Sequence, residues 1–145
     1  MKVKDIMSKE VVIADINDTV ASVAKLMAHH NVGCIPVTEN GQKVLGVITD
    51  RDIVISMTRF SNNFENTKIT EFMSNKVYSI KPDADIADAL DLMKKQQVRR
   101  LPVIDDDVLV GMLSLGDLAV YAQKADYEIS DTLSEICVPL RAENI

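Results

Sequence analysis

Two segments of the chain carry a glycine, a hydroxyl and an aspartate at the same spacing: Gly46, Thr49 and Asp52 in one, Gly111, Ser114 and Asp117 in the other. Where a strand meets a helix, a hydroxyl and the unpaired N–H groups of the helix start favour an anionic or polar ligand. A carboxylate there can accept two hydrogen bonds from a vicinal diol such as a ribose, and a glycine lets a ligand approach the backbone. The same spacing is also that of a capping box, which satisfies helix N–H groups and binds no ligand. The sequence therefore leaves two interpretations, a ligand site and a pair of helix caps.

These segments occur twice because the chain contains an internal repeat. Residues 5–37 align with residues 71–103 at an offset of 66, and the offset falls to 65 after Val37. The second repeat is one residue shorter where its polar stretch 105–107 aligns with the polar stretch 39–43 of the first, and a change of length costs little in such a turn. The repeat therefore indicates two half-size units that share one architecture.

The repeat predicts the domain organisation. A linker that contains Ser and Asn joins the repeats, and a tail with apolar residues at helical spacing follows the second one. The expected bounds are 1–58 for the first repeat, 59–67 for the linker, 68–122 for the second repeat and 123–145 for the tail. We expect the tail to dock on its own subunit or on a neighbour.

Each repeat is expected to run strand, helix, strand, turn, strand, helix. Apolar residues at positions i, i+3, i+4 and i+7 predict a buried helix face in each repeat, formed by Val20, Val23, Ala24 and Met27 and by Ile86, Ala89, Leu90 and Met93. The expected N-caps are Thr19 and Asp85.

Strands are predicted from runs of β-branched, aromatic and other apolar residues. The expected first strands are 11–13 and 77–80, and the expected hairpins are 34–37 with 44–48, around Asn40-Gly41, and 101–104 with 108–113. At roughly 50 residues, neither repeat buries enough surface to be stable alone. We therefore expect an α/β (α+β) fold in which the repeats pack sheet to sheet with pseudo-twofold symmetry and enclose two equivalent clefts.

The composition excludes several classes of partner. With 145 residues and 47% hydrophobic side chains, the chain can form a shared core and is not disordered. A net charge of −6 disfavours nucleic acid and anionic membrane surfaces as partners. Its apolar runs are far shorter than the roughly 20 residues that span a bilayer, and the N-terminus lacks the apolar core of a signal peptide. We expect a cytoplasmic protein in which Cys34 and Cys137 are small buried hydrophobes rather than a disulfide.

The doubled arrangement resembles a tandem pair of CBS domains, the family named after cystathionine beta-synthase. The resemblance covers residues 1–122 and is carried by Ile35-Pro36-Val37, by Leu101-Pro102-Val103 and by the glycine, hydroxyl and aspartate that close each repeat. It implies two CBS repeats, each β-α-β-β-α, that form a stand-alone Bateman module. Such a module binds adenine nucleotides or related adenosyl ligands in the clefts between paired repeats, often as a homodimer.

The resemblance also implies that each cleft takes its aspartate from one repeat and its phosphate contacts from the other. Cleft one would join Thr49, Arg51 and Asp52 to Tyr78, Arg99 and Arg100. Cleft two would join Ser114 and Asp117 to Val12, Gly33 and Cys34.

The two clefts differ in charge. Because Gly33 and Cys34 stand where the second repeat has Arg99 and Arg100, only cleft one offers guanidinium groups that bind phosphate in a fork. We predict a phosphorylated nucleotide in cleft one, and in cleft two weaker binding, no ligand or an uncharged adenosyl group. The alternatives are that Arg99 and Arg100 are a solvated charge pair and that Arg51 forms a surface ion pair.

The sequence does not predict catalysis or a metal centre. His29 and His30 stand at the end of an expected helix, where a cation-prone ring complements the helix dipole, and no carboxylate has ligand spacing to them or to Cys34. We find no phosphate-binding glycine motif, no CxxC pair and no nucleophile beside a base. We therefore expect no enzyme, no metal and no obligatory cofactor.

The expected function is a regulatory module for energy sensing. It would bind AMP, ADP or ATP between the repeats and relay this to an effector protein by a conformational change. The alternatives are a structural or dimerisation module with vestigial clefts, and a module that binds S-adenosylmethionine.

Overall fold

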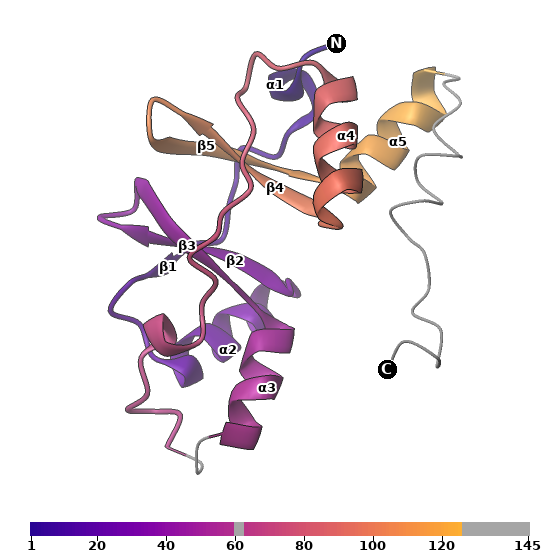
Figure 1. Cartoon of the computed structure of the whole chain (residues 1–145). Coiled ribbons are helices and arrows are strands. Elements are labelled where there is room, and N and C mark those ends of the chain that lie inside the picture. The colour runs from indigo at the N-terminus through magenta and orange to yellow at the C-terminus, as the bar shows by residue number, and fades with distance from the viewer. Residues whose placement is uncertain (60–62, 126–145) are drawn as a thin grey trace. The chain divides into compact units, whose positions relative to one another are not determined.

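The computed structural model describes residues 1–59 and 63–125, which form two compact units (Figure 1). The first-repeat unit comprises residues 10–77 and 104–109. The second-repeat unit comprises residues 1–9, 78–103 and, from residue 110, the remainder of the described chain. The leading segment of each repeat, residues 1–9 and 68–77, therefore belongs to the unit of the other repeat.

The first-repeat unit confirms the expected mixed α/β class. It contains β1 (Ala14–Asp15), α2 (Val20–His30), β2 (Cys34–Glu39), β3 (Lys43–Thr49) and α3 (Asp50–Arg59). Strand β1 is parallel to β2, and β2 is antiparallel to β3, as expected for the predicted hairpin. The predicted first strand at 11–13 is wrong, because the residues that pair with Val37 and Thr38 are Ala14 and Asp15.

The core of this unit lies between α2 and the sheet. The predicted helix face is confirmed for Val20, Val23 and Met27, which are buried, whereas Ala24 is only partly buried. They share a cluster with Ile35, Val37 and Ile48 of the strands and with Ile69 of the short 3₁₀ helix η1 (Ile69–Glu71). Burial of such side chains contributes roughly 1.5–3 kcal/mol each, so this cluster holds the unit together.

The first N–H groups of α2 donate hydrogen bonds both to the N-cap residue and to carbonyls of the linker. Thr19 is the predicted N-cap, and its Oγ1 accepts a hydrogen bond from the N–H of Ser22. The N–H of Val20 donates to the carbonyl of Thr67 at 2.9 Å, and that of Ala21 donates to the carbonyl of Phe64 at 3.0 Å. The end of the linker is therefore built into the first-repeat unit as a cap for α2.

The second-repeat unit contains α1 (Val3–Ile6), α4 (Ile86–Gln96), α5 (Leu115–Ala125) and most of β4 (Arg100–Asp105) and β5 (Val108–Ser114). The ends of these two strands, within residues 104–109, belong to the first-repeat unit. The predicted face of α4 is confirmed, since Ile86, Ala89, Leu90 and Met93 are all buried. The predicted strand at 77–80 is wrong, because this stretch pairs only through an isolated parallel bridge from Ile80 to Val103. Helix α5 includes residues 123–125, and the rest of the predicted tail lies outside the described residues.

The tight turns of the hairpins explain the change of offset between the repeats. Strands β2 and β3 are joined by residues 40–42, and β4 and β5 by residues 106–107, so the second loop is one residue shorter. Asn40 and Gly41 have φ values of 54° and 72°, and Asp106 and Asp107 have 45° and 66°. Two successive left-handed residues are typical of hairpin turns whose twist matches the strands.

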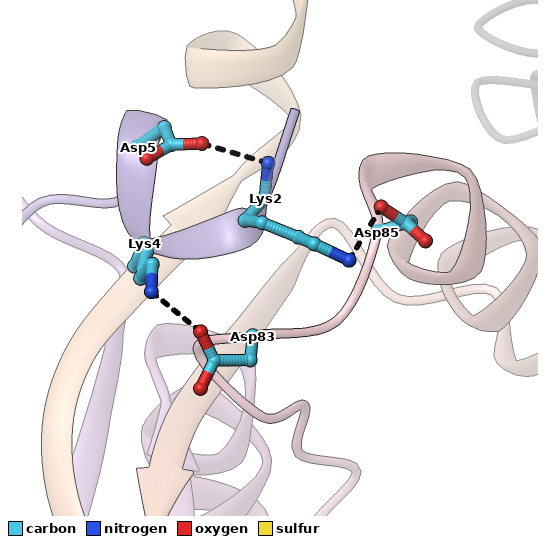
Figure 2. A network of polar contacts seen from close by, with 5 residues as sticks. All are labelled: Lys2, Lys4, Asp5, Asp83 and Asp85. Atoms are coloured by element: carbon cyan, nitrogen blue, oxygen red, sulfur yellow. Dashed lines mark hydrogen bonds and ion pairs between the residues drawn. The ribbon is translucent and has the colours of Figure 1, made fainter.

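The N-terminal segment is held in the second-repeat unit by polar contacts of Lys2 and Lys4 with Asp85 and Asp83 (Figure 2). The ammonium of Lys2 lies 3.0 Å from Asp85, and that of Lys4 lies 2.6 Å from Asp83. Between them Val3 is fully buried, and its N–H donates to the carbonyl of Ala84 at 2.9 Å. The segment is therefore anchored at its backbone, at its apolar side chain and at its charges.

These ion pairs change the titration of their members. The hydrogen bond from Lys4 lowers the pKa of Asp83, and the hydrogen bond from Lys2 lowers the pKa of Asp85, each from a usual 3.8. The hydrogen bond to Asp83 raises the pKa of Lys4 above 10.5. Asp85 occupies the predicted N-cap position of α4, but its side chain makes no capping hydrogen bond to a described residue. The N-cap position of Asp85 is thus confirmed, but its carboxylate binds Lys2 in place of a helix N–H group.

Candidate functional site

The first candidate half-site lies where β3 ends and α3 begins. The Oγ1 of Thr49 accepts a hydrogen bond from the N–H of Asp52 at 3.2 Å, and Oδ2 of Asp52 accepts one from the N–H of Thr49 at 2.8 Å. This is the reciprocal capping box that the spacing allowed. Asp52 is partly exposed, and within residues 1–59 and 63–125 no hydrogen bond reaches its Oδ1. The cap therefore uses one carboxylate oxygen and leaves the other without a hydrogen bond from a described residue.

The second half-site repeats this arrangement where β5 meets α5. The N–H of Ser114 donates to Oδ2 of Asp117 at 2.8 Å, and the N–H of Asp117 donates to Oγ of Ser114 at 3.1 Å. Here the hydroxyl of Ser114 also donates to Oδ2 of Asp117, at 2.7 Å. The proton of Ser114 is therefore engaged by the cap.

The glycine of each segment is required by contacts within the chain, which were not predicted from the sequence. A Cβ at Gly46 would lie 2.8 Å from the carbonyl oxygen of Ser74 and 2.9 Å from the sulfur of Met73. Val47 and Ser74 exchange backbone hydrogen bonds of 3.0 and 2.8 Å beside this contact. Gly46 therefore makes room for the leading segment of the second repeat.

Gly111 makes the corresponding contact in the second-repeat unit. A Cβ there would lie 2.6 Å from the sulfur of Met7 and 2.9 Å from the carbonyl oxygen of Ser8. Ser8 and Met112 exchange backbone hydrogen bonds of 2.9 Å in both directions. The sequence carried a signal for these contacts, since Met7-Ser8 and Met73-Ser74 occupy equivalent positions of the repeat.

Within the first-repeat unit, residues assigned to different clefts lie together. Cys34 is the cross-strand partner of Thr49, and the carbonyl of Gly33 accepts a hydrogen bond from the N–H of Asp50 at 2.9 Å. Val12 is partly buried against the core of the same unit. The start of β2 and the start of α3 thus form one corner.

The second-repeat unit has the equivalent corner with arginines on it. The carbonyl of Arg99 accepts a hydrogen bond from the N–H of Leu115 at 2.9 Å. The side chains of Arg99 and Arg100 are exposed, and neither forms an ion pair with any residue in the described ranges. Tyr78 is partly buried and packs against the core of this unit. Their exposure agrees both with the predicted phosphate contact and with the alternative of a solvated charge pair for Arg99 and Arg100.

The predicted clefts draw on both units. For cleft one, Thr49, Arg51 and Asp52 belong to the first-repeat unit, and Tyr78, Arg99 and Arg100 belong to the second-repeat unit. For cleft two, Val12, Gly33 and Cys34 belong to the first-repeat unit, and Ser114 and Asp117 belong to the second. Arg51 is exposed and, among the residues that the structure describes, has no ion-pair partner, contrary to the expected surface pair.

The remaining candidates are placed as follows. Cys34 is partly exposed, so the expectation of a buried residue is wrong for it, and Cys137 lies outside the described residues. The rings of His29 and His30 meet edge to face at the end of α2, with centroids 4.8 Å apart. Searched over the described part of the chain, His, Cys, Asp and Glu side chains form no group of three or more suited to a metal. Over the same residues, every helix is too short or too polar to cross a membrane.

Comparison with known proteins gives matches over the whole doubled region. A family model of the CBS domain matches the chain twice, at residues 3–58 and 69–124. The CBS domain-containing protein YhcV of Bacillus subtilis is 43% identical over 118 residues, which cover 81% of this chain and 83% of that protein.

Solved structures match with similar coverage. The crystal structure of Hypoxic Response Protein I with two coordinated zinc ions is 30% identical, covers 83% of this chain and 98% of its own, and gives a TM-score of 0.75. A protein of that name from Mycobacterium tuberculosis is 29% identical over 137 residues, 94% of each chain. The CBS domain pair of protein MJ0100, in complex with 5′-methylthioadenosine and S-adenosyl-L-methionine, is 27% identical, covers 83% and 98% of the two chains, and has a TM-score of 0.74.

Proposed function

Because the chain belongs to the CBS domain family and carries two such domains in tandem, we propose that it is a non-catalytic regulatory module that binds an adenine nucleotide in cleft one. The nucleotide would bridge Asp52 of the first-repeat unit and the arginines of the second-repeat unit. It would thereby favour one relative arrangement of the units, and a partner protein would recognise that arrangement.

The observation that carries this proposal is the pair of unpartnered guanidinium groups at Arg99 and Arg100. Guanidinium groups bind phosphate with two parallel hydrogen bonds, and these two face solvent without a carboxylate partner among the described side chains. Asp52 supports the ribose end of the ligand, since its second oxygen is available for a diol. A nucleoside phosphate carries both groups that these residues select.

The bound ligands of the MJ0100 domain pair are adenosyl compounds, which supports the same class of ligand here. They contain no phosphate, whereas Arg99 and Arg100 favour one. We therefore assign AMP, ADP or ATP to cleft one and keep S-adenosylmethionine as the second candidate ligand of this chain.

The test is ligand-induced thermal stabilisation of the full chain. A ligand at a hundredfold excess over its Kd stabilises the native state by about 2.7 kcal/mol, so AMP, ADP or ATP should raise the melting temperature. Asp52→Asn, and separately the double variant Arg99→Gln with Arg100→Gln, should reduce that increase. Asp117→Asn is the matched control, because it alters the same type of cap on α5 and leaves cleft one intact.

Two results would contradict the assignment. If Asp117→Asn removes the increase and Asp52→Asn does not, the nucleotide is bound through Asp117 and not through Asp52. If no adenine nucleotide or S-adenosylmethionine changes the melting temperature of the unaltered protein, the clefts are vestigial and the chain is a structural module.

We further propose that the protein is a homodimer, as the family resemblance implies. Helix α3 exposes Val54, Ile55 and Met57, at 62%, 40% and 55% of their surface. Helix α5 exposes Val120 at 53%, the position equivalent to Ile55. An apolar helix face of this kind is typical of a protein interface. Light scattering should give twice the monomer mass for the unaltered chain and the monomer mass for Val54→Lys with Met57→Lys.

A further inference from the structure

The first-repeat unit carries a carboxylate at the corner where β2 begins. The N–H of Asp50 donates to the carbonyl of Gly33, and the Asp50 side chain lies over this glycine, since a Cβ at Gly33 would be 2.8 Å from Oδ2. The other oxygen, Oδ1, accepts a hydrogen bond from the N–H of Arg51 at 2.8 Å. Asp50 is exposed. The absent side chain of Gly33 therefore lets a carboxylate stand beside Cys34 and face solvent.

The second-repeat unit has the same backbone contact and the opposite charge. The alignment of the repeats pairs Gly33, Cys34 and Asp50 with Arg99, Arg100 and Leu115. The hydrogen bond from Leu115 to Arg99, at 2.9 Å, is the counterpart of the one from Asp50 to Gly33. One corner therefore carries a single negative charge where the other carries two positive charges.

We propose that Asp50 is a specificity-determining residue, and that it makes cleft two select an adenosyl ligand with positive charge, such as a sulfonium, and reject adenosine phosphates. This inference rests on the proposed function, because it takes Gly33 and Cys34 as the contribution of the first-repeat unit to cleft two. A carboxylate at the edge of a site attracts a cationic ligand and repels a phosphate, so it discriminates by repulsion as well as by attraction. Cleft one discriminates in the opposite sense through Arg99 and Arg100.

The test compares three adenosyl compounds whose charges differ. S-adenosylmethionine and S-adenosylhomocysteine differ by the methyl group that makes the sulfur a cation, and AMP is an anion. Isothermal titration would use the Asp52→Ala chain, which lacks the ribose carboxylate of cleft one, with and without Asp50→Asn. An exposed charge pair changes affinity by up to about fivefold. We expect Asp50→Asn to weaken S-adenosylmethionine and strengthen AMP, so that the ratio of their affinities falls about tenfold, while S-adenosylhomocysteine changes least.

Further variants separate charge from shape. Asp50→Glu keeps the charge and should keep the preference for S-adenosylmethionine. Gly33→Arg with Asp50→Leu places the residues equivalent to Arg99 and Leu115 at this corner and should reverse the preference toward AMP. In the Asp117→Ala chain, which lacks the carboxylate of cleft two, Asp50→Asn should leave the affinity for S-adenosylmethionine unchanged.

The results distinguish failure of this inference from failure of the proposed function. If Asp50→Asn leaves the affinity ratio within twofold while Asp117→Ala still abolishes binding at cleft two, the role of Asp50 is refuted and the regulatory module stands. If the unaltered chain binds none of the three compounds, the proposed function is refuted and the specificity of cleft two with it.

Discussion

Substituting Gly111 by alanine tests whether the motif glycines exist for contacts within the chain. The new Cβ would lie 2.6 Å from the sulfur of Met7 and 2.9 Å from the carbonyl oxygen of Ser8. The thioether can move, but the carbonyl also accepts the hydrogen bond from Met112. The bridge between Ser8 and Met112 must therefore open, with loss of two hydrogen bonds that contribute about 1 kcal/mol each.

The expected loss of stability is about 2 kcal/mol if only this bridge opens. It rises to about 5 kcal/mol if the whole N-terminal segment detaches, because burial of a side chain such as Val3 contributes roughly 1.5–3 kcal/mol. Urea unfolding followed by circular dichroism measures the total. Hydrogen exchange at the amides of Ser8 and Met112 shows whether the bridge has opened, and tryptic cleavage at Lys9 shows whether the segment is released.

Gly116→Ala is the matched control in the same unit. The nearest atom to a Cβ at Gly116 is Oγ of Ser114 at 3.5 Å, an ordinary contact, and alanine is favoured over glycine in a helix by up to about 1 kcal/mol. The same chemical change should therefore leave stability equal or raise it. The argument is refuted if Gly111→Ala is as stable as the unaltered chain and the amide of Met112 remains protected.

Three further predictions concern stability. Asp83→Asn with Asp85→Asn should lower the melting temperature near neutral pH. The folded state lowers the pKa of each carboxyl, so each stabilises the fold while it is ionised, and the effect should disappear as pH falls below 3.8. A difference in melting temperature that persists at about pH 2 would contradict this. Gln97→Gly should stabilise the chain by about 0.5–1 kcal/mol in urea unfolding, since Gln97 ends α4 with a left-handed φ of 55°; a net loss would show that its hydrogen bond to Lys94 outweighs the backbone strain. Val3→Ala should destabilise by about 2 kcal/mol, because Val3 is fully buried, and a smaller change than that of Met1→Ala, which is exposed, would refute its anchoring role.

The sequence predicts the helices and hairpins well because their signals are local. The apolar spacing of α2 and α4 marks the buried faces, and Asn40-Gly41 marks a turn that needs two left-handed residues. The one-residue shift of the repeat was also placed in the correct loop, since loops tolerate a change of length.

The first strands were misplaced because their pairing depends on a distant partner. An apolar run such as 11–13 fits a strand, yet the ladder forms one step later, at Ala14 and Asp15, where the parallel partner β2 is available. Pairing between residues 23 positions apart, such as Ala14 and Val37, leaves no mark on either segment alone. For the same reason the sequence does not predict that the leading segment of each repeat packs in the unit of the other. The repeated pairs Met7-Ser8 and Met73-Ser74 were the signal for it.

The candidate site was predicted in its residues and only partly in their roles. Thr49 and Asp52 were identified for binding or capping, and the structure shows that the cap occupies one carboxylate oxygen only. The contact of Gly46 with Ser74 was not predicted, because a glycine required by a neighbouring backbone has the same sequence signal as one required by a ligand. Asp50 was overlooked because its position has no charged counterpart in the second repeat, where Leu115 stands.

The exchange of leading segments bears on how the chain arose. A single-copy ancestor with this architecture would have an open surface over the glycine of its motif, because its own leading segment covers the equivalent surface of a second copy. Two ancestral molecules that exchanged these segments would have formed an obligate dimer. In the present chain the two repeats are covalently joined, so each unit receives its leading segment from the same molecule. The two copies can then differ, as the unlike corners at Gly33 and Arg99 do.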